Sequence, residues 1–285
     1  MMRFVAGIAL VLAACMPLCV LATDGGFSDT SIGFRYGTGF SEPGVVDASG
    51  ASAEIAKRII NVTHVDGSAR GGNLLIIDGL ISDDSDPDKN GDRGAHELYL
   101  IYRHTFASNA FFGGHYAFGP VRDTDLVAGF DLNTKDTAYA PRKRMLVVGP
   151  QFQFAVPKGF FNASLLLEKE YDHNGIVGHA ENFKTTWAIE SAWMLPFHIG
   201  TLPAQFEGYL DLYGPKGRDD FGDETRTETL FHPRLMLDIG SPASHAGPVF
   251  AGIGYEYWYN KFGVDHAITP GAIQHTLMIE AAVHF

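Results

Sequence analysis

Apolar and polar side chains alternate with a period of two residues along most of the chain. The alternation is clearest in residues 274–285, for example between Ile279 and Glu280, and it recurs in residues 249–260 and 183–195. Successive side chains of a β-strand point to opposite faces, so this period predicts strands with one apolar and one polar face.

About twelve segments follow this pattern. Strands of about ten residues cross a bilayer when tilted, whereas no segment after the N-terminal one approaches the roughly 18 apolar residues of a spanning helix. An apolar face for lipid and a polar face for a lumen are typical of membrane barrels. The predicted fold class is all-β, a transmembrane antiparallel β-barrel, with strands near residues 29–38, 57–65, 72–82, 96–107, 124–132, 143–156, 160–171, 183–195, 204–213, 230–240, 249–259 and 274–285.

The connections between these strands sort into two length classes. The longer ones are 39–56, 83–95, 133–142, 172–182, 214–229 and 260–273, and the shorter ones are 66–71, 157–159, 196–203 and 241–247. Residues 111–118 are apolar enough for a thirteenth strand, but an odd number would put the two termini on opposite sides. We therefore expect residues 111–118 to belong to the connection 108–123. This connection is long although it lies on the side of the short ones. Long outer loops and short inner turns predict that both termini are periplasmic.

Residues 1–22 have the composition of a secretory signal peptide, with Arg3 ahead of an apolar stretch. Its removal after Sec-type export would leave residues 23–285 as one domain. A lipoprotein signal ending at Cys15 is the alternative interpretation. Both cysteines, Cys15 and Cys19, lie in this leader, so we expect no disulfide and no cysteine metal site in the mature chain.

Charge and hydropathy narrow the choice of function. The formal net charge of −12 becomes −13 once a leader with one cation and no carboxylate is removed. Binding to nucleic acid depends on clustered cations, so we expect no nucleic-acid partner. A mean hydropathy near zero fits a chain whose apolar residues alternate with polar ones. The rival interpretation, a soluble antiparallel barrel or sandwich, would favour turns of similar length.

Four segments spread over the chain carry a family resemblance. They are SIGFRYGTGFSEPG, GPQFQFAVPKGF, DDFGDETRTETLFHPRL and EYWYNKFG. With them, the chain resembles the nucleoside-specific channel-forming proteins (Tsx-type) of Gram-negative outer membranes.

The resemblance implies a monomeric twelve-stranded barrel in outer-membrane lipid, with a narrow pore for nucleosides. It also implies, as in some relatives, a surface receptor for phages or colicins. The terminal Phe285 resembles the signal that the barrel assembly machinery recognises.

Strand parity predicts which side chains face the lumen. The candidate substrate-binding residues are Tyr99, Arg103, Asp131, Glu190, Glu207, Tyr209, Asp211, Arg234, Glu256 and Trp258. Further inward positions are Glu97, Asp125, Gln151, Gln153, Glu168, Glu170, Lys184, Gln205, Asp238 and Glu280.

Carboxylates outnumber cations in this set, so it would disfavour anionic nucleotides. A neutral base could stack on an aromatic ring while ribose hydroxyls donate to carboxylates. Polar lumens need compensating charges in any barrel, so each single residue also has a structural interpretation. Opposite parity places Tyr255, Tyr257, Tyr259, Trp187 and Trp193 on the lipid-facing side, as interfacial anchors.

Oxygen-bearing residues in one acidic segment have the spacing of a twelve-residue calcium loop. They are Asp86, Asp88, Asn90, Asp92 and Glu97. Strands flank this segment where such loops have helices, so Glu97 would point into the barrel if the segment is a solvated acidic loop instead. Apart from this calcium candidate, we expect no cofactor.

Enzymatic motifs are absent from the sequence. It contains no G-x-S-x-G, no H-E-x-x-H and no phosphate-binding glycine motif. The pairs His173/His179 and His96/His104 lack a third ligand at metal-site spacing. We therefore expect no enzyme, although a lipid-face Ser/His hydrolase stays open. Three classes remain: a nucleoside channel, a less selective small-solute porin, and a receptor or structural barrel.

Overall fold

The computed structural model describes residues 26–91, 93–137, 140–240 and 248–285. Over these residues the regular secondary structure is almost entirely antiparallel strand. The predicted leader, Asp92 and the turn 241–247 lie outside the described residues.

The strands agree with the alternation pattern to within a few residues at each end. They are β1 (Phe27–Phe40), β2 (Ile55–Ser68), β3 (Gly71–Ser82), β4 (His96–Phe106), β5 (Val121–Lys135), β6 (Arg144–Phe154), β7 (Phe160–Asn174), β8 (His179–Asn182), β9 (Thr186–Ile199), β10 (Leu202–Tyr213), β11 (Glu228–Asp238), β12 (Val249–Tyr259) and β13 (Ile273–His284). Within the described residues two short helices accompany them, α2 (Ser108–Phe111) and the 3-10 helix η1 (Lys261–Gly263). None of the described helices is long and apolar enough to cross a membrane.

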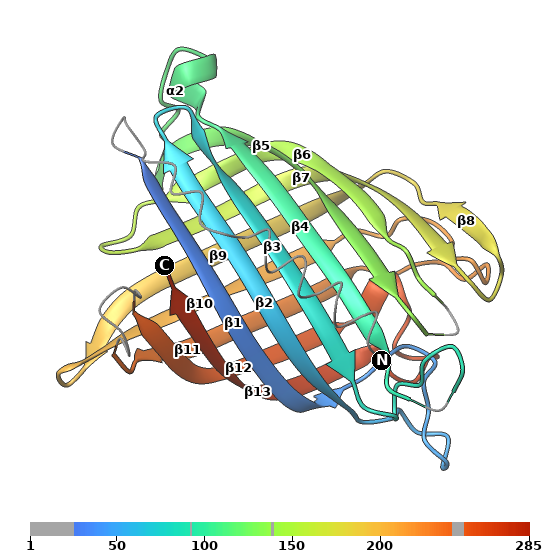
Figure 1. Cartoon of the computed structure of the whole chain (residues 1–285). Coiled ribbons are helices and arrows are strands. Elements are labelled where there is room, and N and C mark those ends of the chain that lie inside the picture. Colours follow the sequence, from blue (N-terminus) through green and yellow to red (C-terminus); the bar gives the residue numbers. More distant parts are fainter. Residues whose placement is uncertain (1–25, 92, 138–139, 241–247) are drawn as a thin grey trace.

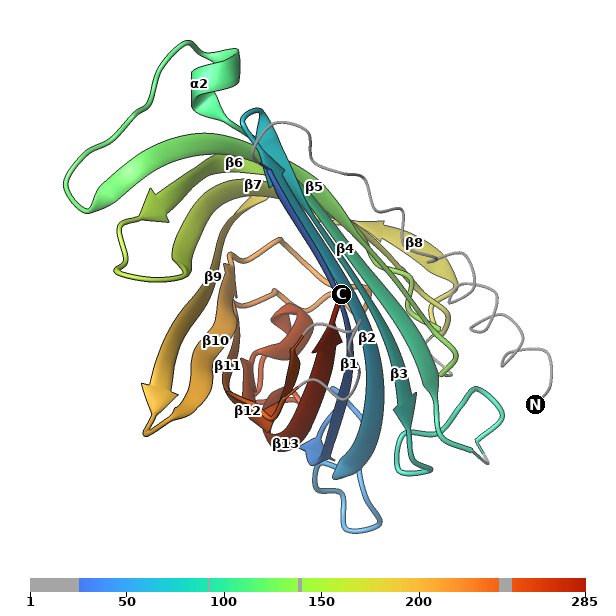
Figure 2. The same ribbon diagram turned by 60° about the vertical axis from the view of Figure 1, so that its left-hand side comes forward.

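Twelve of the thirteen strands form a closed antiparallel ring. Neighbouring strands pair along the chain, β7 pairs directly with β9, and β1 pairs with β13, with Ser31 opposite His284. The short β8 pairs only with β7, so it extends that strand's hairpin and is not part of the wall. Figure 2 shows the sheet curving round until β13 lies beside β1. The prediction of a twelve-stranded antiparallel barrel is confirmed.

The two ends of the barrel differ in their connections. The described short turns, 69–70 and 200–201, lie at the end where β1 begins and β13 finishes. Figure 1 shows α2 at this end and β8 at the opposite one, with the long loops. Residues 111–118 form no strand; α2 and a bridge between Phe118 and Val121 occupy this region, as parity predicted.

The outward face of the ring is apolar and exposed, whereas the inward face is buried and polar. On β13 the outward Leu277 and Ile279 are 66% and 61% exposed, while the inward Thr276, Met278 and Glu280 are buried. The same contrast separates outward Leu165 and Leu167 from Leu166 on β7. The barrel therefore places its apolar side chains where lipid would be and its charges inside.

One glycine is required where the β2–β3 hairpin meets β4. Gly71 has φ 132°, and a Cβ atom there would lie 1.8 Å from the carbonyl oxygen of Thr105. Only glycine fits, because the position combines a left-handed backbone with a neighbouring main chain at contact distance.

Gly71→Ala should therefore destabilise the barrel by more than the roughly 1 to 3 kcal/mol expected from backbone strain alone. The free energy of unfolding in urea, measured in detergent micelles, would test this. Gly113→Ala is the matched control, since Gly113 also has positive φ but nothing lies within 4 Å of its Cβ position. Equal losses in the two variants would contradict the steric explanation.

Candidate functional site

Arg103 on β4 links two carboxylates across the lumen. It donates from Nε and Nη2 to the two oxygens of Glu190 on β9, at 2.9 and 2.6 Å. Its Nη1 donates to Asp131 on β5 at 2.6 Å, and Tyr99 donates to the second oxygen of Asp131 at 2.9 Å. Because β5, β6 and β7 separate β4 from β9, the bidentate pair spans part of the interior. The planar guanidinium fork suits such two-pronged contact with a carboxylate.

Gly129 on β5 gives the Arg103 side chain its space. A Cβ atom there would lie 2.7 Å from Cδ of Arg103 and 2.1 Å from the carbonyl oxygen of Tyr102. The absence of a side chain at Gly129 thus lets the arginine lie along the wall before it crosses to Glu190.

A second group of partners is centred on His232 and Glu280. His232 on β11 is fully buried, with Nε2 2.8 Å from Glu280 and Nδ1 3.1 Å from the hydroxyl of Tyr209. A proton on Nε2 satisfies both contacts, because the imidazole then donates to the carboxylate and accepts from the tyrosine. Arg234 bridges Glu280, at 3.3 Å, to Glu207, at 2.9 Å.

Two further features complete this second group. Arg35 on β1 pairs with Asp78 on β3, which also accepts from Asn61. A Cβ atom on Gly254 would lie 1.8 Å from Oε1 of Glu280, so glycine at this position makes room for the carboxylate.

Solvent reaches both groups from inside the barrel. The side chains of Arg234, Asp78, Glu190 and Glu207 are 31%, 21%, 17% and 16% exposed, whereas those of Asp131 and Glu280 are 2% and 1% exposed. Each group therefore has buried members against the wall and hydrated members toward the interior.

A third group of charges lies at the long-loop end. Glu42 follows β1 and contacts Lys57, Lys135 at 3.2 Å and Lys261 at 3.5 Å. Burial raises the pKa of Glu42, but Lys135, Lys261 and Lys57 outweigh this and hold it well below its ordinary value. Burial lowers the pKa of the Lys261 ammonium to about 8, although Glu42 acts in the opposite direction.

Nine of the ten candidate residues contribute to the first two groups or lie beside them. The first group consists of Tyr99, Arg103, Asp131 and Glu190. Asp211 lies beside it and interacts electrostatically with Glu190 and Arg103. Glu207, Tyr209 and Arg234 belong to the second, with Glu256 3.9 Å from His232. Parity therefore placed these side chains on the correct face.

Trp258 is separate from them, at the long-loop end. Its indole donates to Glu228 at 2.7 Å, and the ammonium of Lys261 lies 4.4 Å from the ring centre. Phe262 meets the same ring edge to face at 5.0 Å. These partners occupy much of the ring, so base stacking on Trp258 stays a prediction.

The described members of the acidic segment have separate protein partners. Asp86 contacts Lys135 at 2.7 Å, Asp88 accepts from the backbone of Asn90 at 2.8 Å, and Glu97 accepts from Asn133. Asp92 lies outside the described residues. Calcium binding here stays a prediction.

The outward aromatics lie where parity put them. Trp187 and Tyr255 are 41% and 37% exposed, and Tyr257 stacks on Tyr259. Trp193 is 8% exposed because it packs between Phe206 and Phe231.

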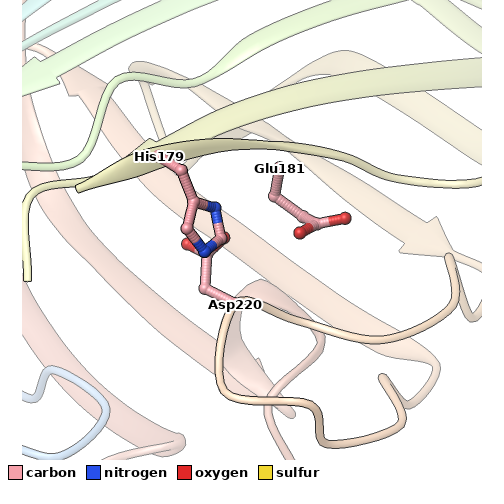
Figure 3. Close-up of side chains that lie close together, drawn as sticks. All are labelled: His179, Glu181 and Asp220. Carbon is pink, nitrogen blue, oxygen red and sulfur yellow. The ribbon is translucent and has the colours of Figure 1, made fainter. Parts of the chain in front are cut away.

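Two sequence interpretations need correction. Lys184, placed in the lumen by parity, is exposed and precedes β9, which begins only at Thr186. The metal-site spacing argument missed the group His179, Glu181 and Asp220, whose ligand atoms lie within 4.8 Å of one another (Figure 3). Spacing along the chain could not find it, because Asp220 comes from a different loop.

Several lumen charges were missed altogether. Arg35 was recoverable, since it shares inward parity with Ser31 on β1. Lys143, which contacts Glu170 at 3.2 Å, begins the predicted strand 143–156 and shares the inward parity of Met145, so it was recoverable too. Lys216, which contacts Glu170 at 2.6 Å, lies outside the strands and carries no parity signal. His232 was recoverable as well, since it lies two residues from Arg234 on β11 and shares its inward parity.

In sequence, the chain matches no protein-family model and no curated protein. Among solved structures, it is similar to the translocator domain of the autotransporter NalP from Neisseria meningitidis, at 10% identity and a TM-score of 0.44, over 99% of this chain and 94% of that one. It is also similar to the KdgM porin, at 8% identity and a TM-score of 0.42, over 88% and 97% of the two chains. The barrel described above rests on the strand pairing of this chain itself.

The buried ammonium of Lys261 predicts a pH dependence of stability. Its folded pKa of about 8 lies below the ordinary lysine value of 10.5, so between these pH values the unfolded chain binds more protons than the folded one. The unfolding free energy of the wild type should therefore rise with pH relative to that of Lys261→Met, by up to about 3 kcal/mol across this window.

Urea titrations between pH 7 and 11 would measure this difference. Lys158→Met, which removes an exposed lysine, is the control and should follow the wild type. A constant difference between Lys261→Met and wild type would show that burial does not discharge this lysine.

Proposed function

We propose that this chain is an outer-membrane channel for small solutes, and that nucleosides are the class it passes. The observation that carries the proposal is a charge-paired inner wall with partly exposed members such as Arg234 and Asp78, inside a belt of exposed apolar side chains. A closed barrel leaves no unpaired strand edge, which makes it one of the two structures that can span lipid.

The outer surface supports a membrane location. Three outward side chains near the middle of their strands are exposed, namely Val148 on β6 at 43%, Leu167 on β7 at 62% and Ile253 on β12 at 52%. Exposed leucines and isoleucines on this many neighbouring strands would be unfavourable in water. Lipid would cover them, with the long loops on the cell surface and both termini in the periplasm.

The interior supports passage of small polar solutes. The Arg103–Glu190 pair crosses the lumen, while Arg234, Glu207 and Asp78 offer hydrated charges nearby. Groups that are already paired bind a passing solute weakly, which is what conduction requires. Exposed carboxylates would accept hydrogen bonds from sugar hydroxyls and repel phosphate.

The choice of nucleosides rests on the sequence resemblance. A less selective porin uses the same polar wall without a preference for a base. A receptor or structural barrel would have no useful pore. Electrical recording on the purified protein separates these three classes.

The first expected result concerns selectivity in planar lipid bilayers. Adenosine or thymidine should reduce the ion current in a saturable way, whereas adenosine monophosphate and glucose at equal concentration should have much weaker effects. Equal block by glucose would favour the unselective porin. A protein that inserts but carries no current would overturn the channel proposal.

The second expected result concerns the Arg103–Glu190 pair. Glu190→Ala removes the carboxylate that draws Arg103 across the interior, while Asp131 still holds the guanidinium at the wall. Single-channel conductance should therefore increase. Glu224→Ala is the control, because it removes an exposed carboxylate from a loop pair with Arg218. Unchanged conductance in Glu190→Ala would mean that this pair does not limit the pore.

A further inference from the structure

Three potential metal ligands, two from a short strand and one from a separate loop, meet at the long-loop end of the barrel. His179 and Glu181 lie on β8, and Asp220 lies in the loop between β10 and β11. Figure 3 shows the imidazole and the carboxylate of Asp220 pointing toward each other, with Glu181 beside them. Nothing in the solute pathway proposed above uses these residues.

The carboxylate of Asp220 gives a second, independent indication of a ligand. Its side chain is only 8% exposed, and its Oδ1 atom is buried without a hydrogen-bond partner. A buried carboxylate oxygen without a partner is unfavourable, because it has lost water and gained no donor. Burial raises the pKa of Asp220, and the neighbouring Glu181 carboxylate raises it further. A cation between these groups would give Oδ1 a partner and would stabilise the ionised carboxylate.

The distances suit an ion better than a direct hydrogen bond. Nδ1 of His179 lies 3.8 Å from Oδ1 of Asp220, which is too long for a hydrogen bond. Two ligands of a tetrahedral zinc ion, each about 2.1 Å from the metal, lie about 3.4 Å apart. The ligand atoms, which lie within 4.8 Å of one another, would have to approach by at most about 1.4 Å.

We propose that His179, Glu181 and Asp220 bind one divalent transition-metal ion of the zinc class. An imidazole nitrogen with two carboxylates suits zinc or its first-row neighbours, whereas calcium and magnesium take oxygen ligands. Three protein ligands leave a fourth position for water. The side chain of His179 is 60% exposed, so an ion can reach this group directly from solvent.

The bound ion would tie two surface segments together. β8 belongs to the hairpin that extends β7, and Asp220 belongs to the loop 214–227. Neither segment is held in the ring of strands at this point. Metal binding should therefore stiffen the surface above the pore without changing the barrel wall.

The test uses the full-length barrel in detergent micelles, stripped with a chelator and titrated with zinc chloride by calorimetry. Wild type should bind one zinc ion per chain. His179→Gln and Asp220→Asn should each lower the affinity by about tenfold or more, since each removes a direct ligand. The exposed His179 makes the first variant safe for folding even if the second is not. Excess calcium chloride should not displace the zinc.

His115→Gln is the matched control. His115 lies 2.6 Å from Asp123 on the opposite end of the barrel, so it is a histidine–carboxylate pair without a third ligand in the described structure. This variant should bind zinc like wild type. In hydrogen exchange, zinc should slow the amides of residues 179–182 and 214–227 in wild type and in His115→Gln only.

Equal zinc binding by all four proteins, or displacement of zinc by calcium, would overturn the proposal. Loss of zinc binding should leave the ion current of the pore unchanged, because none of the three ligands belongs to the barrel wall. The metal site and the channel therefore succeed or fail independently.

Discussion

A charged side chain inside a barrel of this width has lost much of its water, so it must find a partner of opposite charge. Arg103 shows the consequence, because its guanidinium donates to Glu190 and Asp131 and also to the carbonyls of Tyr102 and Phe130. Removing one partner of a buried pair typically destabilises a protein by about 3 to 5 kcal/mol. The position of each charged side chain in the lumen therefore depends on the position of its partner. The paired side chains together determine which part of the lumen stays open to solvent.

This constraint also explains the glycines on the inner wall. Gly129 and Gly254 lie where Arg103 and Glu280 need space against the sheet. Larger side chains at these two positions would push the charged groups toward the centre of the barrel. The glycines on the wall thus allow the long charged side chains beside them to lie flat against the sheet.

The sequence was sufficient to predict the strands of the barrel wall and the face of each side chain. It was insufficient to predict which side chains pair inside the lumen. A period of two residues identifies strands and faces, and it placed Arg103, Glu190 and Glu207 inward because parity depends only on the local backbone. It could not pair Arg103 with Glu190, since that contact depends on how far each strand is staggered around the ring. Loop residues such as Lys216, Lys261 and Asp220 have no parity, so their approach to the rim could not be predicted. β8 was missed for a similar reason, because it is too short to show a period.

The seam between β1 and β13 joins segments from the two extremes of the described chain, with Phe285 donating to the carbonyl of Thr30 at 2.8 Å. All other wall pairings join strands that follow each other in the ring and in the sequence, apart from the small detour around β8. Contacts of such long sequence separation form slowly, because a long loop must close before they contribute. Closure of this seam should be the last step of folding. Until then, β1 and β13 present open edges that another chain could pair with, which makes the interval before closure the time when this protein is most prone to aggregate.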